Sequence, residues 1–201
     1  MDHPAFSDYI VRELILASTS PYRKQLLQRL QLPFRQVKPE FIELPPGSSM
    51  DTSELVLHNA AGKAESILSR YPEATVIASD QLAVCGDTVL GKPGDAERAI
   101  TQLSILSGKS VTFLTSLCLF SRRERQQDII PFTVHFRELS HAEICSYVSC
   151  EKPYDCAGSF KSEALGITLF ERMVGDDPTA LIGLPLIRLS QWLKPLSYIQ
   201  P

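Results

Sequence analysis

The sequence has little of what marks a secreted or membrane-bound protein. Its 201 residues include five cysteines, an odd number with no Cys-x-x-Cys pair. This usage argues against a disulfide framework and predicts reduced thiols in a cytoplasmic protein. Apolar runs such as Leu117–Phe120 are too short to span a membrane. Met1–Pro4 have neither the basic start nor the apolar stretch of a signal peptide, so we expect none.

An excess of positive charge is also missing. The chain has 20 Lys and Arg against 23 Asp and Glu, a net charge of -3. Such a chain has no overall field that would gather a nucleic-acid polymer, so anion binding must come from a local cluster of cations. We therefore expect a small anionic ligand rather than a nucleic acid or a membrane as partner.

The length and composition predict one globular domain. Hydrophobic residues make up 44% of the 201 residues, enough for one well-buried core. No internal repeat or low-complexity linker divides the chain. We expect an N-terminal extension over 1–12, a single domain over 13–195 and a C-terminal tail over 196–201.

Hydrophobic periodicity and turn residues predict an α/β fold around a mixed sheet. Strands and helices alternate in the first half of the chain, and a long antiparallel hairpin follows. The expected strands are 14–17, 34–37, 75–77, 109–121, 128–137 and 167–173, and the expected helices cover 21–30, 51–70, 95–107, 140–148 and a segment from 185. The helix from 140 is expected to open with a capping box of Ser140 and Glu143.

The first of these helices begins at a site suited to an anion. Ser20 is expected to cap the helix and Pro21 to occupy its first position, directly after a buried strand and a hydroxyl-rich loop. Unpaired N–H groups at such a helix start attract negative charge. The hydroxyls of Ser18 and Ser20 would add a fixed cradle for phosphate.

A carboxylate and an ammonium are expected at the two ends of a compact β unit. The strand from Thr75 is predicted to end at Asp80 and Gln81, and a hairpin around Gly86 returns the chain to Lys92. An aspartate at a strand end often only forms a turn or caps a helix. The residues of this unit alone leave both readings of Asp80 open.

Five motifs in order together resemble a known family. They are Leu14–Arg23, Ser79–Gln81, Gly91–Pro93, Ala157–Glu163 and Ile182–Pro185. The chain resembles the Maf family of nucleoside triphosphate pyrophosphatases from Leu14 to Lys194. Its Asp80-Gln81 pair and the Ser159–Glu163 run are similar to the YceF-type subfamily, which hydrolyses 7-methyl-GTP.

The resemblance implies a single Maf-like (inosine-triphosphatase-like) α/β domain with an elongated, twisted mixed sheet and two lobes flanking a cleft. A nucleoside triphosphate would be cut there to the monophosphate and diphosphate with Mg²⁺ or Mn²⁺. It also implies a homodimer, since family members are often dimers. Asp80 matches the family's proton acceptor. The positions associated with substrate choice are matched by Tyr22, Gln81 and Glu163. Other polar positions of the family's cleft are matched by Ser18, Arg23, Glu43, Lys63 and Lys92.

Elementary chemistry gives these residues matching roles. Cutting between the α and β phosphates needs cations, an aligned water and a base for its proton. Arg23, Lys63 and Lys92 are the cations expected to bind phosphate, although a helix also needs solvated lysines and arginines on its polar face. Glu43 and Asp80 are hard oxygen ligands suited to Mg²⁺ or Mn²⁺ bridging protein and phosphate.

The base would be recognised by an aromatic ring and a carboxylate. N7-methylation gives guanine a positive charge, which favours the face of an aromatic ring. Tyr22 could stack on the base, where the 7-methyl-GTP type usually has Trp. Glu163 could accept hydrogen bonds from the guanine edge or offset its charge.

Two departures from the family pattern leave alternatives open. Ile42 stands where an acidic residue usually precedes Glu43, and Ala164 replaces a glycine. The first departure would leave one carboxylate where two could hold metal, and it favours a non-catalytic nucleotide-binding regulator of septum formation. A pyrophosphatase for dTTP, UTP or CTP is a further alternative, against which Gln81 and Glu163 argue.

Overall fold

A mixed sheet forms the long spine of the molecule in the computed structural model, which describes residues 12–198. Within these residues the sheet has seven strands in the order β2-β1-β3-β5-β6-β7, with β4 paired to β3. β1 is parallel to β2 and β3, and all other pairings are antiparallel. The strands are β1 (Leu14–Ala17), β2 (Arg35–Val37), β3 (Thr75–Cys85), β4 (Thr88–Leu90), β5 (Ser110–Phe120), β6 (Arg125–Phe136) and β7 (Phe170–Val174).

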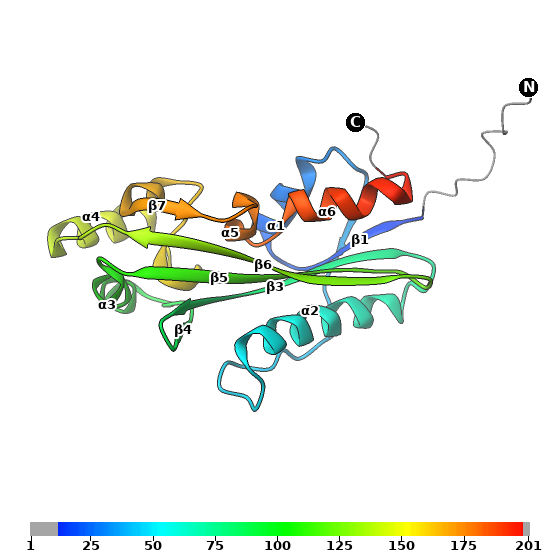
Figure 1. Ribbon diagram of the computed structural model, residues 1–201, viewed down its shortest axis with the longest axis horizontal. Coiled ribbons are helices and arrows are strands. Elements are labelled where there is room, and N and C mark those ends of the chain that lie inside the picture. Colours follow the sequence, from blue (N-terminus) through cyan, green and yellow to red (C-terminus); the bar gives the residue numbers. More distant parts are fainter. Residues whose placement is uncertain (1–11, 199–201) are drawn as a thin grey trace, which may run out of the picture.

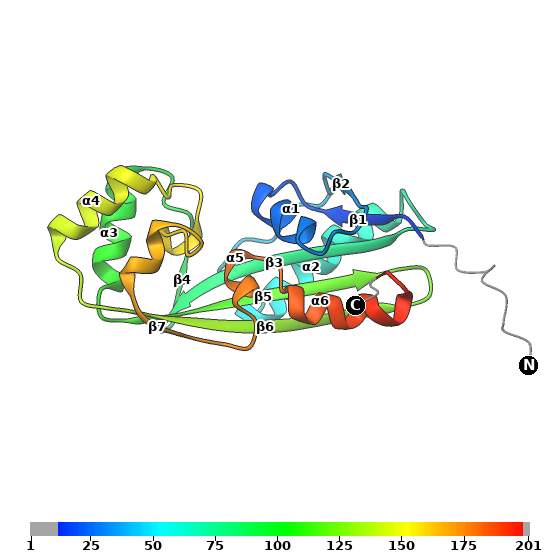
Figure 2. The same cartoon turned by 90° about the horizontal axis from the view of Figure 1, so that it is seen from above.

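Helices cover both faces of the sheet and build two lobes. Figure 1 shows α2 on one face, with α1 and α6 on the other, while α3 and α4 lie at one end of the elongated molecule. Seen from above, the α3–α4 end stands apart from α1 and β1, which confirms the predicted α/β fold with two lobes (Figure 2). The helices are α1 (Pro21–Gln28), α2 (Thr52–Leu68), α3 (Ala96–Leu106), α4 (His141–Glu151), α5 (Pro178–Ile182) and α6 (Leu186–Leu193), with 3₁₀ turns η1 (Ala157–Ser159), η2 (Leu165–Leu169) and η3 (Lys194–Leu196).

The alternation of side chains along β1 divides the core between the two faces. Ile15 and Ala17 pack with the cluster that includes Ala60 and Ala64 of α2, whereas Leu14 and Leu16 belong to the cluster on the opposite face. Successive strand residues point to opposite faces, so a short strand with apolar residues at every position is buried on both sides. β1 thus carries its C-terminal end, and the polar loop after it, into the middle of the molecule.

The local signals for helix ends are confirmed. Ser20 caps α1, its hydroxyl accepting from the Arg23 amide at 3.3 Å, and Pro21 is the first helical residue. Ser140 and Glu143 form the expected capping box of α4. Such caps depend on only a few neighbouring residues, which explains why the sequence shows them.

The prediction that the strand from Thr75 ends at Asp80 is wrong. β3 continues to Cys85, and Asp80 lies in its middle, opposite Ser116 of β5. Residues of β5 pair with β3 from Val76 to Val84, and this ladder of hydrogen bonds keeps the chain extended past the polar residues. Asp80 is therefore fixed by a central strand rather than by a turn.

The segment before α6 also differs from the expectation. The strand expected over 167–173 begins only at Phe170, because η2 occupies the residues before it. The short helix α5, which was not expected, begins at Pro178, and the Asp177 carboxylate accepts from the Thr179 amide at 2.9 Å. α5 carries the Ile182–Pro185 motif to the centre of the sheet.

The expected extension over 1–12 lies outside the described residues except for Arg12, as does the expected tail beyond Tyr198. The Tyr198 hydroxyl lies 2.8 Å from the Arg12 carbonyl oxygen and 2.9 Å from Thr75 Oγ1. In the part of the chain that the structure describes, no helix has the length and apolar character needed to cross a membrane.

Candidate active site

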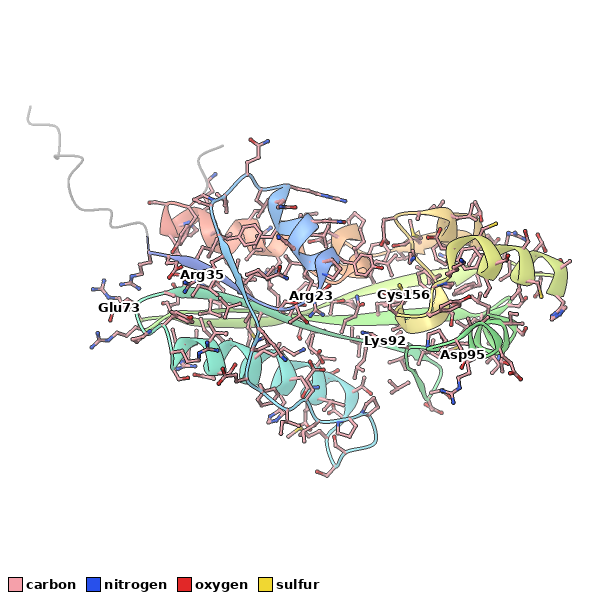
Figure 3. The ribbon with its side chains drawn as sticks, turned by 180° about the vertical axis from the view of Figure 1, so that it is seen from behind. Arg23, Arg35, Glu73, Lys92, Asp95 and Cys156 are labelled. Carbon is pink, nitrogen blue, oxygen red and sulfur yellow. The ribbon has the colours of Figure 1, made fainter. Side chains whose placement is uncertain are left out.

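A cleft of about 430 Å³ opens between the two lobes. In Figure 3, Arg23 on α1, Lys92 after β4 and Cys156 before η1 come from three separate parts of the chain and lie around this region. The volume is within the range of ordinary small-molecule sites. All the residues expected at the site line it: Ser18, Ser20, Tyr22, Arg23, Glu43, Lys63, Asp80, Gln81, Lys92 and Glu163.

Lys63 holds two of the predicted acidic residues together. Its ammonium lies 2.7 Å from Asp80 Oδ1 and 2.8 Å from Glu43 Oε1. The Lys63 side chain is only 5% exposed, and that of Asp80 10%, whereas that of Glu43 is 55% exposed. Lys63 is thus no solvated surface lysine, and the two carboxylates converge on one buried cation at the floor of the cleft.

Asn59, which sequence reasoning missed, fastens the loop of Glu43 to Asp80. Its side-chain oxygen accepts from the Leu44 amide at 2.9 Å, and its amide nitrogen lies 3.1 Å from the Leu44 carbonyl and 3.3 Å from Asp80 Oδ2. Asn59 precedes Lys63 by one helical turn, so both point from α2 to the same side. This spacing of two polar residues beside the apolar face of α2 was the available signal.

Neighbouring side chains in the segment of Glu43 have different surroundings. Phe41 lies against Gly62, where any Cβ would overlap the Phe41 ring. Ile42 is 91% exposed and does not line the cleft, whereas Glu43 points into it. Ile42 therefore does not displace the Glu43 carboxylate from the cleft. The replacement that favoured a non-catalytic regulator lies outside the cleft.

Arg23 is anchored by the backbone of the Ile182–Pro185 motif. Its Nε donates to the Gly183 carbonyl at 2.8 Å, and the Ser79 hydroxyl donates to the same oxygen at 2.9 Å. Gly183 has φ +115°, a conformation that favours glycine, so the motif has a structural reason. Burial lowers the pKa of Arg23, while the charges of Asp80 and Glu43 oppose this shift.

The anchored arginine keeps binding capacity. Among residues 12–198 its guanidinium makes no hydrogen bond besides that of Nε. Its two terminal NH₂ groups are therefore available for phosphate oxygens, which guanidinium can bind through parallel hydrogen bonds.

The loop before α1 has hydroxyl groups with protons to donate. Ser18 Oγ accepts from the Ser20 amide at 3.1 Å, and Ser20 Oγ accepts from the Arg23 amide at 3.3 Å. Both hydroxyls act as acceptors in these bonds, so their own protons remain for an anion in the cleft. The eight-residue helix α1 begins at the same place.

Gln81 faces the turn of α5. Its amide nitrogen lies 2.8 Å from Thr115 Oγ1 and 2.8 Å from the Ala180 carbonyl oxygen. These bonds fix the amide plane, so that any ligand meets Gln81 in one orientation. Because the amide nitrogen is used in these bonds, Gln81 would contact a nucleotide base through its side-chain carbonyl oxygen.

Tyr22 reaches across the cleft. Its hydroxyl donates to Asp155 Oδ2 at 3.2 Å, a contact between residues 133 positions apart. Burial raises the pKa of Tyr22, and neighbouring Cys156 and Asp155 raise it further, so the hydroxyl stays a proton donor. Glu163 and Lys92 are exposed residues of the same cleft.

The second departure from the family pattern does not lie at a left-handed position. Ala164 has φ −131°, whereas the conformation that particularly favours glycine has a positive φ. A positive φ is therefore not the reason for a glycine at this position.

The acidic residues fit a metal shared with a ligand. Within residues 12–198, no three His, Cys, Asp or Glu side chains gather as a self-contained metal site. Glu43 and Asp80 approach the same ammonium, however; Glu43 keeps a second oxygen, and Asp80 Oδ2 has only the longer contact of 3.3 Å with Asn59. Two hard oxygen donors completed by phosphate oxygens and water are what Mg²⁺ usually takes in nucleotide sites.

The fold and cleft belong to a recognised class of proteins. The sequence profile described as Maf-like protein matches residues 13–196, and the chain belongs to this family. The resemblance seen in the five motifs is thereby confirmed.

Individual relatives are similar over nearly their whole length. A Pseudomonas aeruginosa protein named 7-methyl-GTP pyrophosphatase is 51% identical over 183 residues, 90% of this chain and 95% of its own. A protein of the same name from Colwellia psychrerythraea is 48% identical over 186 residues, 92% of this chain and 92% of its own. Another from Pseudomonas syringae is 52% identical over 184 residues, 90% of this chain and 94% of its own.

Proposed function

We propose that this protein is a nucleoside triphosphate pyrophosphatase that hydrolyses 7-methyl-GTP to 7-methyl-GMP and diphosphate, thereby removing a modified nucleotide. The observation that carries the proposal is the convergence of Asp80, Glu43 and Lys63 beside Arg23 in one cleft. The names of relatives with about half their residues identical support the substrate.

The phosphates bind where the cations and hydroxyls gather. Arg23 offers its terminal NH₂ groups, Ser18 and Ser20 offer hydroxyl protons, and Lys92 approaches from the other lobe. The start of α1 adds backbone N–H groups that attract negative charge. These groups hold the triphosphate along the cleft with its α-phosphorus toward β3.

Asp80 acts as the base. A water between Asp80 and the α-phosphorus loses its proton to the carboxylate as its oxygen attacks phosphorus, and the bond to the oxygen bridging the α and β phosphates breaks. Diphosphate leaves with the electron pair of that bond. Lys63 and Asn59 hold Asp80 at 2.7 Å and 3.3 Å, so its orientation is set before the substrate arrives.

Glu43 and Asp80 would hold a divalent cation, Mg²⁺ or Mn²⁺, together with phosphate oxygens. When bound, such an ion neutralises charge that develops on the phosphate oxygens. Asn59 would help by hydrogen-bonding both Asp80 and the backbone of Leu44, next to Glu43, which holds the two carboxylates near each other.

The base would lie near Tyr22, Gln81 and Glu163. The ring of Tyr22 offers an aromatic face to the cationic 7-methylguanine, which gains more from such a face than neutral guanine does. Glu163 accepts from the N–H groups of the guanine edge, and Gln81 presents its carbonyl oxygen. A pyrimidine triphosphate would not offer the carboxylate the adjacent ring and amino N–H donors of guanine.

A nucleotide panel tests the proposal. Release of diphosphate is measured with 7-methyl-GTP, GTP, dTTP, UTP and CTP while Mg²⁺ or Mn²⁺ is titrated. We expect the highest kcat/KM for 7-methyl-GTP and activity that requires the metal. A preference for pyrimidines would favour the canonical-nucleotide alternative, and binding without hydrolysis at any metal concentration would favour the regulator.

Asp80→Asn tests the base. The asparagine keeps the shape of the side chain and removes its ability to take a proton, so we expect kcat to fall about 10²-fold or more. Asp87→Asn, an exposed aspartate at the β3–β4 turn, makes the same change outside the cleft and should keep wild-type kcat. A folded Asp80→Asn protein that binds 7-methyl-GTP and hydrolyses it at the wild-type rate would exclude Asp80 as base.

In this role the protein would act on free nucleotides in the cytoplasm rather than on nucleic acid or at a membrane. The expected homodimer is open to test by analytical ultracentrifugation of the full chain. A mass of one chain at micromolar concentration would argue against it.

A further inference from the structure

One carboxylate of the cleft has no part in the roles described so far. Asp155 lines the cleft from the loop before η1, a turn that packs against α3. Its Oδ2 accepts from the Tyr22 hydroxyl at 3.2 Å, and its Oδ1 lies 3.5 Å from Cys156 Sγ. The contact with Tyr22 joins α1 to this loop, two segments of the cleft lining that lie far apart in the sequence.

The loop that carries Asp155 is itself held in place. The Gly94 amide donates to the Tyr154 carbonyl at 2.9 Å, which ties the loop to the segment after Lys92. The Cys156 amide donates a hydrogen bond to the Pro153 carbonyl at 3.3 Å. These bonds hold the backbone of the loop, and from it the exposed side chain of Asp155 reaches the Tyr22 hydroxyl.

Asp155 carries its negative charge in this position. Burial alone would raise the pKa of Asp155, but hydrogen bonds from Cys156, the backbone and Tyr22, together with the charge of Lys161, bring it below its ordinary value. A phenol that donates to a carboxylate has a more electron-rich ring, and the carboxylate adds its own negative potential beside that ring. Both effects favour a cationic ring stacked on Tyr22.

We propose, on the basis of the function proposed above, that Asp155 is a positioning residue for substrate choice: it orients the Tyr22 ring from the loop before η1 and adds negative charge beside it, so that the cleft prefers the cationic 7-methylguanine to guanine. The residue acts through Tyr22 and takes no part in the bond cleavage. Its effect should therefore differ between two substrates that share the same triphosphate.

The test compares 7-methyl-GTP with GTP in wild type and Asp155→Asn. Asparagine keeps a hydrogen-bond acceptor for Tyr22 and removes the charge. We expect the ratio of kcat/KM for 7-methyl-GTP to that for GTP to fall about tenfold, mainly through a higher KM for 7-methyl-GTP, as the size of a cation–π interaction implies. Asp87→Asn, with the same charge change at an exposed turn, should keep the wild-type ratio.

Tyr22→Phe supplies the second arm. It keeps the ring and removes the hydroxyl that contacts Asp155, so we expect the ratio to fall here as well. In the double variant the effect of Asp155→Asn should be smaller than in wild type, because both residues act through one ring. If Asp155→Asn fails to fold, Tyr22→Phe alone tests the contact by the same ratio.

The outcomes separate this inference from the proposed function. Wild type that hydrolyses no 7-methyl-GTP would overturn the function and the inference with it. Wild type that prefers 7-methyl-GTP, with an unchanged ratio in Asp155→Asn, would overturn the inference alone. An equal loss for both nucleotides would also overturn it, because that loss would show a structural role without a role in base choice.

Discussion

Asn59→Ala should weaken both the fold and the catalytic site, because Asn59 joins the Glu43 loop to Asp80. The change removes hydrogen bonds to the Leu44 amide at 2.9 Å and the Leu44 carbonyl at 3.1 Å, and a longer one of 3.3 Å to Asp80. Each good bond contributes about 1 kcal/mol net, so the first two account for about 2 kcal/mol. The longer bond adds less, and the better helix propensity of alanine offsets about 0.5 kcal/mol.

We therefore expect the free energy of unfolding of Asn59→Ala to fall by about 2 kcal/mol, measured by urea denaturation. Asn59 is 3% exposed, so water cannot easily replace the lost partner of Leu44. Ser53→Ala, at an exposed position in the first turn of the same helix, is the control and should change stability by less than about 0.5 kcal/mol.

The activity of Asn59→Ala should fall by more than its stability suggests. Without Asn59, the loop of Glu43 can move relative to Asp80, and a displacement of about 1 Å can cost about 10²-fold in rate. We expect kcat/KM for 7-methyl-GTP to fall by about this factor and the metal concentration for half-maximal activity to rise. Measurements at temperatures well below the unfolding midpoint keep the two effects apart.

Two results would refute this reasoning. A variant with near wild-type stability would mean that the Leu44 backbone groups find other partners once Asn59 is removed. A destabilised variant with wild-type kcat/KM and metal dependence would mean that the relative position of Glu43 and Asp80 is immaterial to the reaction. In that case Glu43 could not be a ligand of the catalytic metal.

Two further predictions concern the same loop and the pH dependence of stability. Gly62→Ala would gain about 1 kcal/mol from helix propensity alone, but the Phe41 ring occupies the space of the new Cβ. We therefore expect the free energy of unfolding in urea to fall by about 1–2 kcal/mol and the activity to fall as well, and a gain in stability would contradict the packing argument. Capping-box hydrogen bonds lower the pKa of Glu143 from 4.5 to about 2, so the stabilising effect of its charge should be complete above pH 4.5 and vanish as the pH falls toward 2. The difference in stability between wild type and Glu143→Gln, followed by circular dichroism, should therefore disappear over that range. A difference that stays constant would argue against the capping role.

Local sequence signals predicted the parts of the fold that depend on neighbouring residues. The cap by Ser20, the capping box of Ser140 and the buried strand β1 each rest on a few adjacent side chains, and the structure confirms them. The extent of β3 does not follow from such signals. Asp80 stays in a strand because β5, more than thirty residues later, supplies the hydrogen bonds, and a polar residue after an apolar run gives no sign of that partner.

The site shows the same division. The motifs pointed to the residues that line the cleft, but the partners that orient them came only from the structure. Asn59 lies on a helix whose apolar face dominates the pattern, and Asp155 lies in an irregular loop without periodicity. Both act through contacts with residues distant in the sequence, Leu44 and Tyr22, and spacing along one chain cannot show such contacts.

The balance of charge in the cleft gives a physical reason to expect that substrate binding needs a metal. Lys63 and Arg23 face Glu43 and Asp80, so the positive charge of these two residues is already matched by the carboxylates before a ligand arrives. A triphosphate brings several further negative charges, and Lys92 with the start of α1 can offset only part of them. Glu43 and Asp80 would repel the phosphates unless a cation lay between them. On the function proposed above, the same carboxylates would impede binding of the free nucleotide and favour its complex with a divalent cation.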